Sequence, residues 1–471
     1  MRIELEPIAE RFLPSKYFGL LKPVLQRADE ILTGQTDNAR TQRIALIVFA
    51  IRIASAFITF VSQIILARWL GEFNYGVFVA VWVAVLIVTT ISCIGFPSAV
   101  VRYIAEYQEK EEFGLMRGVI RASIGIVAVS ATTISAFGFF VLYNYPQLLA
   151  EHFMIPALIG AIYLPMLALE NVMGNIARAF NWPMTAYLPV FVFRPVGMLI
   201  VLGIALIAGF AADAETALWS TLIAAYTTTI SKLIYIIYRL RKVIVPEKPE
   251  YKIKTWFLVA APIFLVEGFY VLHTSIDVLF VSYLVNPEET AIYFASVKIL
   301  ALVHFVYFAV RSTAAPKYAA LNTAGDMVKF QQFVQTSVSW TFCPTLFLAL
   351  IVCVLGKFIL MLFGDAFTAG YSIVWILALG IVLRSAVGPA ESLLVMAGGQ
   401  IACASIYAVT FSVNIALNLA LIPIYGIEGA AIATACAFGF ESLGLYVIAN
   451  RLLGIHAFVI PRREHATGEV V

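Results

Sequence analysis

The sequence predicts an all-α membrane protein with twelve transmembrane helices in two pseudo-symmetric six-helix bundles around a central cleft. First, twelve apolar stretches follow one another with short gaps, each close to the roughly 20 residues that cross a ~30 Å hydrocarbon core. Second, 62% of the 471 residues are hydrophobic and 13% are charged, about half of the charged fraction of a soluble domain. Third, basic residues gather in every second gap. Almost no chain is left for a soluble domain.

The first half of the chain holds six spans behind a polar to amphipathic tail. The tail, residues 1–43, spaces its apolar side chains as a surface helix does, and we expect it to lie on the cytoplasmic face of the membrane. The spans predict an N-terminal lobe over residues 44–238. They cover roughly residues 44–67, 75–97, 119–143, 155–178, 186–209 and 216–238.

The second half follows a polar segment with two prolines, residues 239–255, which we expect to be a cytoplasmic linker. Six further spans predict a C-terminal lobe over residues 256–452, before a cytoplasmic tail, residues 453–471. These spans cover roughly residues 256–284, 290–312, 333–355, 371–394, 401–423 and 428–452.

The distribution of basic residues predicts the orientation in the membrane. The N-terminal tail and every second gap after it carry arginine or lysine, whereas the alternate gaps offer only Arg68 and Lys357. Cytoplasmic loops carry the excess of basic residues, so both termini and the linker are expected in the cytoplasm.

The two halves also match each other as a repeat. A shift of 215 residues places Phe49 on Phe264 and Thr59 on Thr274. Because each half has an even number of spans, the two would share one orientation, related by a pseudo-twofold axis along the membrane normal.

The opening spans of the two halves carry polar stripes at matching positions. Arg52 begins a stripe with Ser55, Thr59 and Ser62, and Glu267 begins one with Tyr270, Thr274 and Asp277; each stripe lies on one helix face. A charge at the centre of a helix costs about 2.5–3.5 kcal/mol to insert. We therefore expect Arg52 and Asp277 to face a shared cavity rather than lipid.

Other spans add charges to this set. Lys298 lies deep in the eighth span, Glu170 in the fourth, and Arg194 directly before Pro195 in the fifth. Arg178, Arg311 and Arg384 lie nearer the cytoplasmic face and are expected to extend toward lipid headgroups. Glu391 shares a helix face with Arg384, and Glu441 is expected to be an interhelical partner.

Several functions lack their motifs. The chain has no P-loop, no H-E-x-x-H and no G-x-S-x-G, which disfavours ATP hydrolysis and the common hydrolases. Its five cysteines include no C-x-x-C pair, so no metal site is indicated. Two bundles around a charged cleft are typical of an alternating-access transporter rather than an enzyme.

Four short motifs carry a family resemblance. They are Gly71-Glu-Phe-Asn-Tyr-Gly76, Asn286-Pro-Glu-Glu-Thr-Ala-Ile-Tyr293, Phe363-Gly-Asp-Ala-Phe367 and Tyr425-Gly-Ile-Glu-Gly-Ala-Ala431. In order and spacing, over residues 41–455, the chain resembles Wzx-type polysaccharide flippases of the multidrug/oligosaccharidyl-lipid/polysaccharide exporter superfamily. Ala291 stands where the first motif has Gly76, and twelve spans differ from the fourteen of the peptidoglycan-precursor branch.

The resemblance implies that the chain flips a polyprenyl-diphosphate-linked oligosaccharide from the inner to the outer leaflet of the bacterial inner membrane. The product would feed surface polysaccharides such as lipopolysaccharide or exopolysaccharide. Membrane lipids, a polysaccharide polymerase and glycosyltransferases are the expected partners, and no nucleic acid or cofactor is expected.

The substrate's chemistry assigns roles to the candidate residues. Arginine and lysine bind phosphate through charge-assisted hydrogen bonds, so Arg52, Lys298 and Arg194 are the candidates for the diphosphate. Tyrosine rings can stack on sugars, which points to Tyr270, Tyr293 and Tyr307. The carboxylates Glu267, Asp277 and Glu170 would balance these cations or bind a coupling H⁺ or Na⁺.

Two alternatives remain open. A multidrug antiporter of the same superfamily would need an excess of acids in its cavity to attract cationic drugs. A membrane-embedded glycan polymerase or ligase usually needs a sizeable outer loop, whereas the outer gaps here span about a dozen residues at most.

Overall fold

The computed structural model describes residues 37–460, with the side chains of residues 37–50, 52, 53 and 323 left out. Most of the predicted N-terminal tail and the last eleven residues of the C-terminal tail therefore lie outside the described residues. The described part is helical throughout and contains no strand. Its helices are α3 (Asp37–Cys93), α4 (Phe96–Glu109), α5 (Phe113–Asn144), α6 (Glu151–Ala179), α7 (Pro183–Leu188), α8 (Arg194–Ile207), α9 (Ala214–Val243), α10 (Ile253–Leu284), α11 (Pro287–Ala324), α12 (Met327–Phe363), α13 (Tyr371–Ser385), α14 (Ala390–Met396) and α15 (Gln400–Leu453).

Two of the longest helices are each divided into two arms by a glycine. Gly71 in α3 has φ 74° and Gly426 in α15 has φ 58°, backbone conformations that glycine adopts without steric cost. Ten helices of the described part are long and apolar enough to cross a membrane. When the two arms of α3 and of α15 are counted separately, these become the twelve predicted spans.

Two other predicted spans are interrupted where proline removes a backbone donor. The fifth span consists of α7, a π-helical turn (Pro189–Phe193) and α8. The tenth consists of α13 and α14 with a break between them, where Gly388 has φ 58°.

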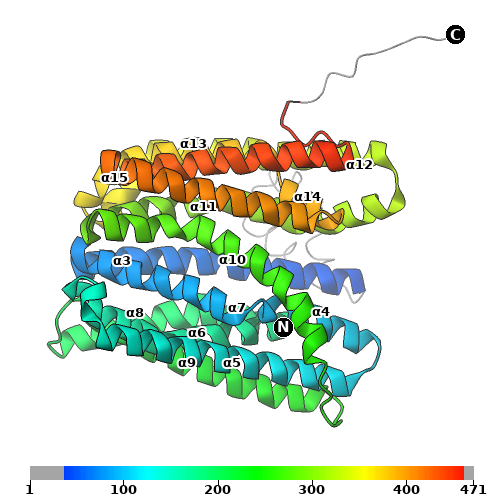
Figure 1. Cartoon of the computed structure of the whole chain (residues 1–471), viewed down its shortest axis with the longest axis horizontal. Coiled ribbons are helices and arrows are strands. Elements are labelled where there is room, and N and C mark those ends of the chain that lie inside the picture. The colour runs from blue at the N-terminus through cyan, green and yellow to red at the C-terminus, as the bar shows by residue number, and fades with distance from the viewer. Residues whose placement is uncertain (1–36, 461–471) are drawn as a thin grey trace, which may run out of the picture.

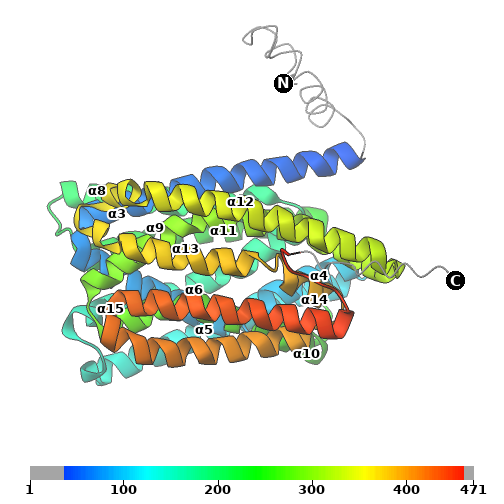
Figure 2. The same ribbon diagram turned by 90° about the horizontal axis from the view of Figure 1, so that it is seen from above.

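The helices run along one common axis and gather in two lobes (Figure 1). In that view α5 to α9 lie below and α11 to α15 lie above, with α3 and α10 between them. We name the left side of the view the kink end, because it carries Gly71 and Gly426. The right side is the linker end, which carries the segment 244–252 between α9 and α10. Figure 2 shows α12 extending past the other helices at the linker end.

Two connections of the N-terminal lobe fall at matching positions of the predicted repeat. With the shift of 215 residues, Gly71 coincides with Asn286, the residue that caps the start of α11. The turn between α4 and α5 likewise coincides with the turn between α11 and α12. These connections agree with the predicted repeat, whereas the interruptions of the fifth and tenth spans have no counterpart in the other lobe.

The lobes touch closely at the kink end. A Cβ atom added to Gly76 would lie 1.8 Å from the backbone oxygen of Pro287, so only glycine allows this approach. The neighbouring Tyr75 packs edge-on against Phe294 and Phe367, with ring centroids 6.3 and 6.1 Å away. The motifs Gly71–Gly76 and Asn286–Tyr293 therefore contact each other between the lobes.

At the linker end, α10 is bound to α4 of the other lobe. Ser98 Oγ donates to Glu267 Oε1 at 2.5 Å, and Trp256 Nε1 donates to the Tyr107 hydroxyl at 2.8 Å. A Cβ atom on Gly95 would lie 2.2 Å from the backbone oxygen of Ala260. We call these contacts the α4–α10 latch; they tie the first helix of the C-terminal lobe to the N-terminal lobe.

Candidate transport site

In the N-terminal lobe, three charged side chains meet inside the bundle. Arg194 Nη1 lies 2.6 Å from Glu170 Oε2, and the guanidinium lies over the Trp82 ring, 5.2 Å from its centroid. Lys232 Nζ donates to the backbone oxygen of Glu170 at 3.3 Å. Glu170 and Lys232 are 2% and 3% exposed. This N-lobe cluster, Glu170, Arg194 and Lys232, holds two cations against one carboxylate.

Local sequence chemistry positions this cluster. Arg194 is the first residue of α8 and directly follows the π-helical turn Pro189–Phe193. A π turn inserts one extra residue per turn and so rotates the following side chains about the helix axis. Gly174, one turn after Glu170 on α6, leaves room for the lysine, because a Cβ atom there would lie 3.3 Å from Lys232 Nζ.

In the C-terminal lobe, four charged side chains from four helices form one chain of contacts. Glu391 Oε1 lies 2.6 Å from Arg311 Nη1, and Arg384 Nη2 lies 2.9 Å from Glu441 Oε1 and 4.0 Å from Glu391 Oε2. We call Arg311, Arg384, Glu391 and Glu441 the C-lobe network. It holds two cations and two carboxylates, so its formal charges balance.

Further polar side chains bind the network. His273 Nε2 lies 3.3 Å from Glu441 Oε2, and the Tyr407 hydroxyl donates to Glu391. The guanidinium of the central arginine lies over the ring of Tyr307, 5.1 Å from its centroid.

Arg384 corrects one expectation. We expected this side chain to extend toward lipid headgroups, but the residue is 4% exposed and is bound to Glu441 inside the lobe. A carboxylate within reach in the bundle is a better partner than a distant headgroup, because the alternative leaves Glu441 buried without a counter-charge.

Lys298 stands apart from both clusters. It follows Pro287 by eleven residues on α11, which places it about 17 Å from the kink end and near the middle of a membrane. Its ammonium lies 4.6 Å from the centroid of the Phe294 ring, and no carboxylate of the described residues lies within ion-pair distance of it. Lys298 is thus a half-buried cation without a counter-charge in the described part of the chain.

The α10 stripe does not face a single surface. Glu267 binds Ser98 in the α4–α10 latch, whereas Asp277 is buried in the C-terminal lobe. Tyr293 donates to Asp277 Oδ2 at 2.5 Å and Thr434 donates to the same atom at 3.2 Å. The helix therefore presents one carboxylate to each lobe.

The other candidates are distributed as follows. Tyr270 packs against Tyr407 beside the C-lobe network, with ring centroids 6.2 Å apart. Tyr307 lies beneath Arg384 and is 7% exposed. The side chain of Arg52 lies outside the described residues, so its predicted role stays a prediction. The structure thus pairs Glu170 with Arg194 and Asp277 with Tyr293. Lys298 belongs to neither cluster.

The sequence interpretation missed Lys232, although a signal existed. It is the only charged residue within the predicted span 216–238. The sequence does not show the pairing of Arg384 with Glu441 or of Arg311 with Glu391, because it does not specify which helices pack together.

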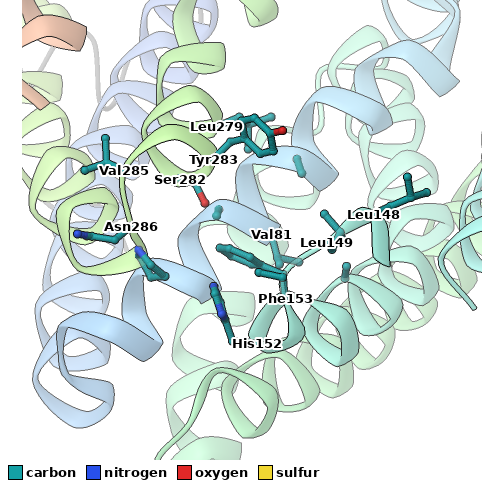
Figure 3. A pocket seen from close by; sticks show the side chains of 15 residues that line it. Val81, Leu148, Leu149, His152, Phe153, Leu279, Ser282, Tyr283, Val285 and Asn286 are labelled. Atoms are coloured by element: carbon teal, nitrogen blue, oxygen red, sulfur yellow. The ribbon is translucent and has the colours of Figure 1, made fainter. Parts of the chain in front are cut away.

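An apolar groove of about 540 Å³ lies between the lobes at the kink end. It is lined mainly by Val81, Leu149 and Phe153 of one lobe and by Leu279 and Tyr283 of the other (Figure 3). Figure 3 also shows His152 and Asn286 at this groove, where they add polar groups. In the described residues no group of three or more His, Cys, Asp or Glu side chains is arranged to hold a metal ion.

Comparison with protein families gives one match. Residues 43–318, more than half of the chain, match the family model described as "Polysaccharide biosynthesis protein". Among curated proteins, no significant sequence match is found.

Solved structures share the fold at low sequence identity. An inward-facing multidrug resistance MATE family transporter of the MOP superfamily superposes with a TM-score of 0.69 at 13% identity, covering 85% of this chain and 94% of the other. The lipid II flippase MurJ in an inward closed conformation gives a TM-score of 0.65 at 15% identity, covering 86% and 87%. A MOP superfamily transporter from Pyrococcus furiosus, described as having a binding pocket of reverse polarity, gives 0.63 at 14% identity, covering 87% and 94%.

Proposed function

The chain belongs to the polysaccharide biosynthesis protein family, and from this membership we propose that it flips a polyprenyl-diphosphate-linked oligosaccharide across the bacterial inner membrane. Transport runs from the inner to the outer leaflet by alternating access of the two lobes. In this proposal both termini face the cytoplasm, and a polysaccharide polymerase and glycosyltransferases act on the same lipid-linked glycan.

The excess of buried cations carries the proposal. Lys298 has no carboxylate partner in the described residues, and the N-lobe cluster holds Arg194 and Lys232 against Glu170 alone. Keeping unneutralised cations in a bundle is costly unless they have a use. A diphosphate supplies the missing negative charge, and arginine can bind it through two parallel hydrogen bonds.

The groove at the kink end suits the lipid part of the same substrate. It is apolar, lies between the lobes and is large enough for several isoprene units. A polyprenyl chain that enters this groove from the bilayer loses no hydration, because it moves from one apolar environment to another. The glycan then occupies the space between the lobes while the part of the tail next to the diphosphate occupies the groove.

The remaining candidates take roles consistent with their surroundings. Tyr270 is half-buried and can stack on a sugar ring, whereas Tyr293 and Tyr307 are buried within the C-terminal lobe and reach a sugar only if that lobe rearranges. Arg52 joins Lys298 and Arg194 as a diphosphate ligand. Glu170 balances Arg194 until the diphosphate arrives, while Glu267 and Asp277 are candidates for a coupling H⁺ or Na⁺.

The test compares a deletion strain with strains that carry single variants. Lipid-linked glycan on each leaflet is measured by mass spectrometry together with surface polysaccharide. We expect deletion to accumulate the lipid-linked glycan on the inner leaflet and to abolish the surface polymer. Unchanged intermediates with intact surface polymer, together with altered drug susceptibility, would instead support a multidrug antiporter.

Two lysines on α11 give a matched pair of variants. Lys298 and Lys317 both lie over a phenylalanine ring, 4.6 and 4.3 Å from its centroid, but Lys317 is near the linker end. A hydrogen bond to a charged group contributes about 1.5–3 kcal/mol, so Lys298→Ala should lower flipping roughly ten- to a hundredfold at normal protein level. Lys317→Ala should leave the rate unchanged; equal loss in both variants contradicts the diphosphate role.

A further inference from the structure

A second cavity, of about 360 Å³, opens between α7 and α9 of the N-terminal lobe. It shares no lining residue with the apolar groove at the kink end. The wall formed by α7 and the π-helical turn is mainly apolar and presents Met184, Leu188 and Phe193. The wall formed by α9 is polar and carries hydroxyl side chains together with Lys232. We call this cavity the α7–α9 pocket.

Lys232 lines this pocket although its side chain is buried. Its Nζ donates to the backbone oxygen of Glu170 at 3.3 Å, and it makes no other hydrogen bond with the described residues. The carboxylate of Glu170 instead binds Arg194 at 2.6 Å. Because an ammonium group has three N–H donors, two of them remain for a ligand in the pocket.

Hydroxyl groups add further donors around the ammonium. Thr185, Ser231 and Tyr235 line the pocket, and within the described part of the chain none of their hydroxyls has a hydrogen-bond partner. The hydroxyls of Thr227 and Thr228, by contrast, already donate to backbone oxygens one turn earlier on α9. No aspartate or glutamate is among the described residues that line the pocket. A ligand that satisfies this site therefore brings negatively charged oxygen atoms.

The pocket lies at the depth of lipid headgroups. Arg239 follows Lys232 by seven residues on the same face of α9, about 10 Å nearer the linker end. Its guanidinium lies over the rings of Trp182 and Tyr235, 4.1 and 5.7 Å from their centroids. Tryptophan and tyrosine gather where a membrane meets water, and basic residues follow outside. Lys232 therefore lies just inside the membrane interface at the linker end.

The two walls together fit a molecule with an anionic head and an apolar tail. The apolar wall runs from Met184 toward Phe193, away from the linker end and into the hydrocarbon. A free inorganic anion would leave this wall without a partner, and a metal cation would be repelled by the ammonium of Lys232. A lipid phosphate supplies both the negative oxygen atoms and the apolar chain, and an ammonium binds phosphate through charge-assisted hydrogen bonds.

We propose that the α7–α9 pocket binds the phosphate headgroup of a lipid from the leaflet at the linker end. Lys232 and the hydroxyls of Ser231 and Tyr235 bind the phosphate oxygens, and the start of the lipid tail packs on the α7 wall. The lipid is an anionic membrane phospholipid or a polyprenyl phosphate, which share this chemistry. The bound phosphate gives the N-lobe cluster a counter-charge on its Lys232 side. Binding requires neither a glycan nor transport, so the site stands apart from the proposed function.

The test uses the purified full chain in phosphatidylcholine nanodiscs without a glycan. A trace of phosphatidic acid with a photoreactive group at the start of its acyl chain is added, and cross-linked peptides are mapped by mass spectrometry. We expect the cross-links to concentrate on residues 183–193, the α7 wall. Unlabelled phosphatidic acid should remove them, although the bulk phosphatidylcholine does not. Cross-links spread evenly over the lipid-facing helices would overturn the proposal.

Variants with matched controls on α9 test the named side chains. Lys232→Gln should weaken competition by phosphatidic acid roughly tenfold or more, because it removes a charged hydrogen bond. Tyr235→Phe keeps the ring and lies outside the N-lobe cluster, so it should fold normally and weaken competition severalfold. Lys242→Gln and Tyr238→Phe are the controls, since Lys242 lies over the Tyr238 ring at 4.3 Å outside the pocket. If both pocket variants bind like the wild type, the proposal is wrong.

Competition in the same samples identifies the source of the phosphate. Stronger competition by phosphatidic acid than by polyprenyl phosphate assigns the site to a membrane phospholipid, and the reverse order assigns it to the carrier lipid. Either order supports a lipid phosphate site. If inorganic phosphate competes as well as either lipid, the tail contributes nothing and the assignment to a lipid is wrong.

Flipping measured in proteoliposomes separates this site from the proposed function. Cross-links at the α7 wall without any flipping would reject the proposed function and keep the pocket. Flipping without cross-links at the α7 wall would reject the pocket alone.

Discussion

In the N-terminal lobe two cations share one carboxylate, whereas in the C-terminal lobe two arginines face two glutamates. The lobes share much of their pattern of helices and turns, but the fifth and tenth spans are interrupted at positions that do not correspond. A cluster with one more cation than carboxylate can accept an anion without leaving a negative charge unpaired. A balanced network needs no added ion to neutralise its buried charges.

The largest expected effect breaks the balance of the C-lobe network. Arg384→Met keeps the volume of the side chain but leaves Glu441 and Glu391 without their central partner. Removing one member of a buried ion pair costs about 3–5 kcal/mol, so we expect a marked fall in the free energy of unfolding. Thermal unfolding of both variants in one detergent measures this change. If Arg384→Met loses less stability than Lys232→Met, the proposed difference between the two lobes is wrong.

A second variant uncovers the cations of the N-lobe cluster. Glu170→Gln leaves Arg194 and Lys232 without an anion, and we expect a loss of about 1–3 kcal/mol, less than for Arg384→Met because Arg194 is partly exposed. Inorganic pyrophosphate should restore part of the melting temperature, since it replaces the lost charge. The restoration should be absent in the Glu170→Gln, Arg194→Gln double variant; equal restoration in both would remove the anion site.

Lys232→Met should separate stability from transport. A well-packed apolar side chain in place of a buried ion is often neutral, so the free energy of unfolding should change by less than about 1 kcal/mol. Flipping should nevertheless fall roughly tenfold, the effect of about 1.4 kcal/mol in binding. Normal flipping at normal stability would show that Lys232 contributes only to packing.

The smallest expected effect concerns the exposed ion pair of Asp326 and Lys329, which lies on the surface. Lys329 donates hydrogen bonds to Asp326, and these hold the pKa of that carboxyl below its ordinary value. Because the folded pKa is lowered, the pair stabilises the start of α12 above the ordinary carboxyl range, and the effect is lost as pH falls through the folded pKa. Asp326→Asn should leave the melting temperature nearly unchanged at neutral pH, and its thermal profile should match the wild type in acid.

Local signals predicted most of the fold. The hydrophobic length of each span gave the twelve crossings, and the glycine motifs marked the breaks at Gly71 and Gly426. The sequence shows Pro195 directly after Arg194 in the fifth span, but it does not predict the π-helical turn that precedes Arg194. The match of Gly71 with Asn286 agrees with the predicted repeat, for which sequence identity alone gives scarcely any support.

The candidate site was predicted less completely. The sequence showed that Lys298, Arg194 and Asp277 are charges within apolar spans, since insertion cost depends only on the residue and its neighbours along the chain. It placed Glu267 and Asp277 on one helix face, but the structure directs the first to the N-terminal lobe and the second into the C-terminal lobe. The rotation of a helix depends on what packs around it, which periodicity does not specify.

The sequence by itself thus determined that this chain crosses a membrane many times and that several charges lie within its apolar spans, because both follow from local hydrophobicity. Only the tertiary structure decided which charges meet. Glu170 pairs with Arg194 and Glu441 pairs with Arg384 because helix packing brings distant segments within about 3 Å. This pairing decides whether the buried cations of a lobe outnumber its carboxylates.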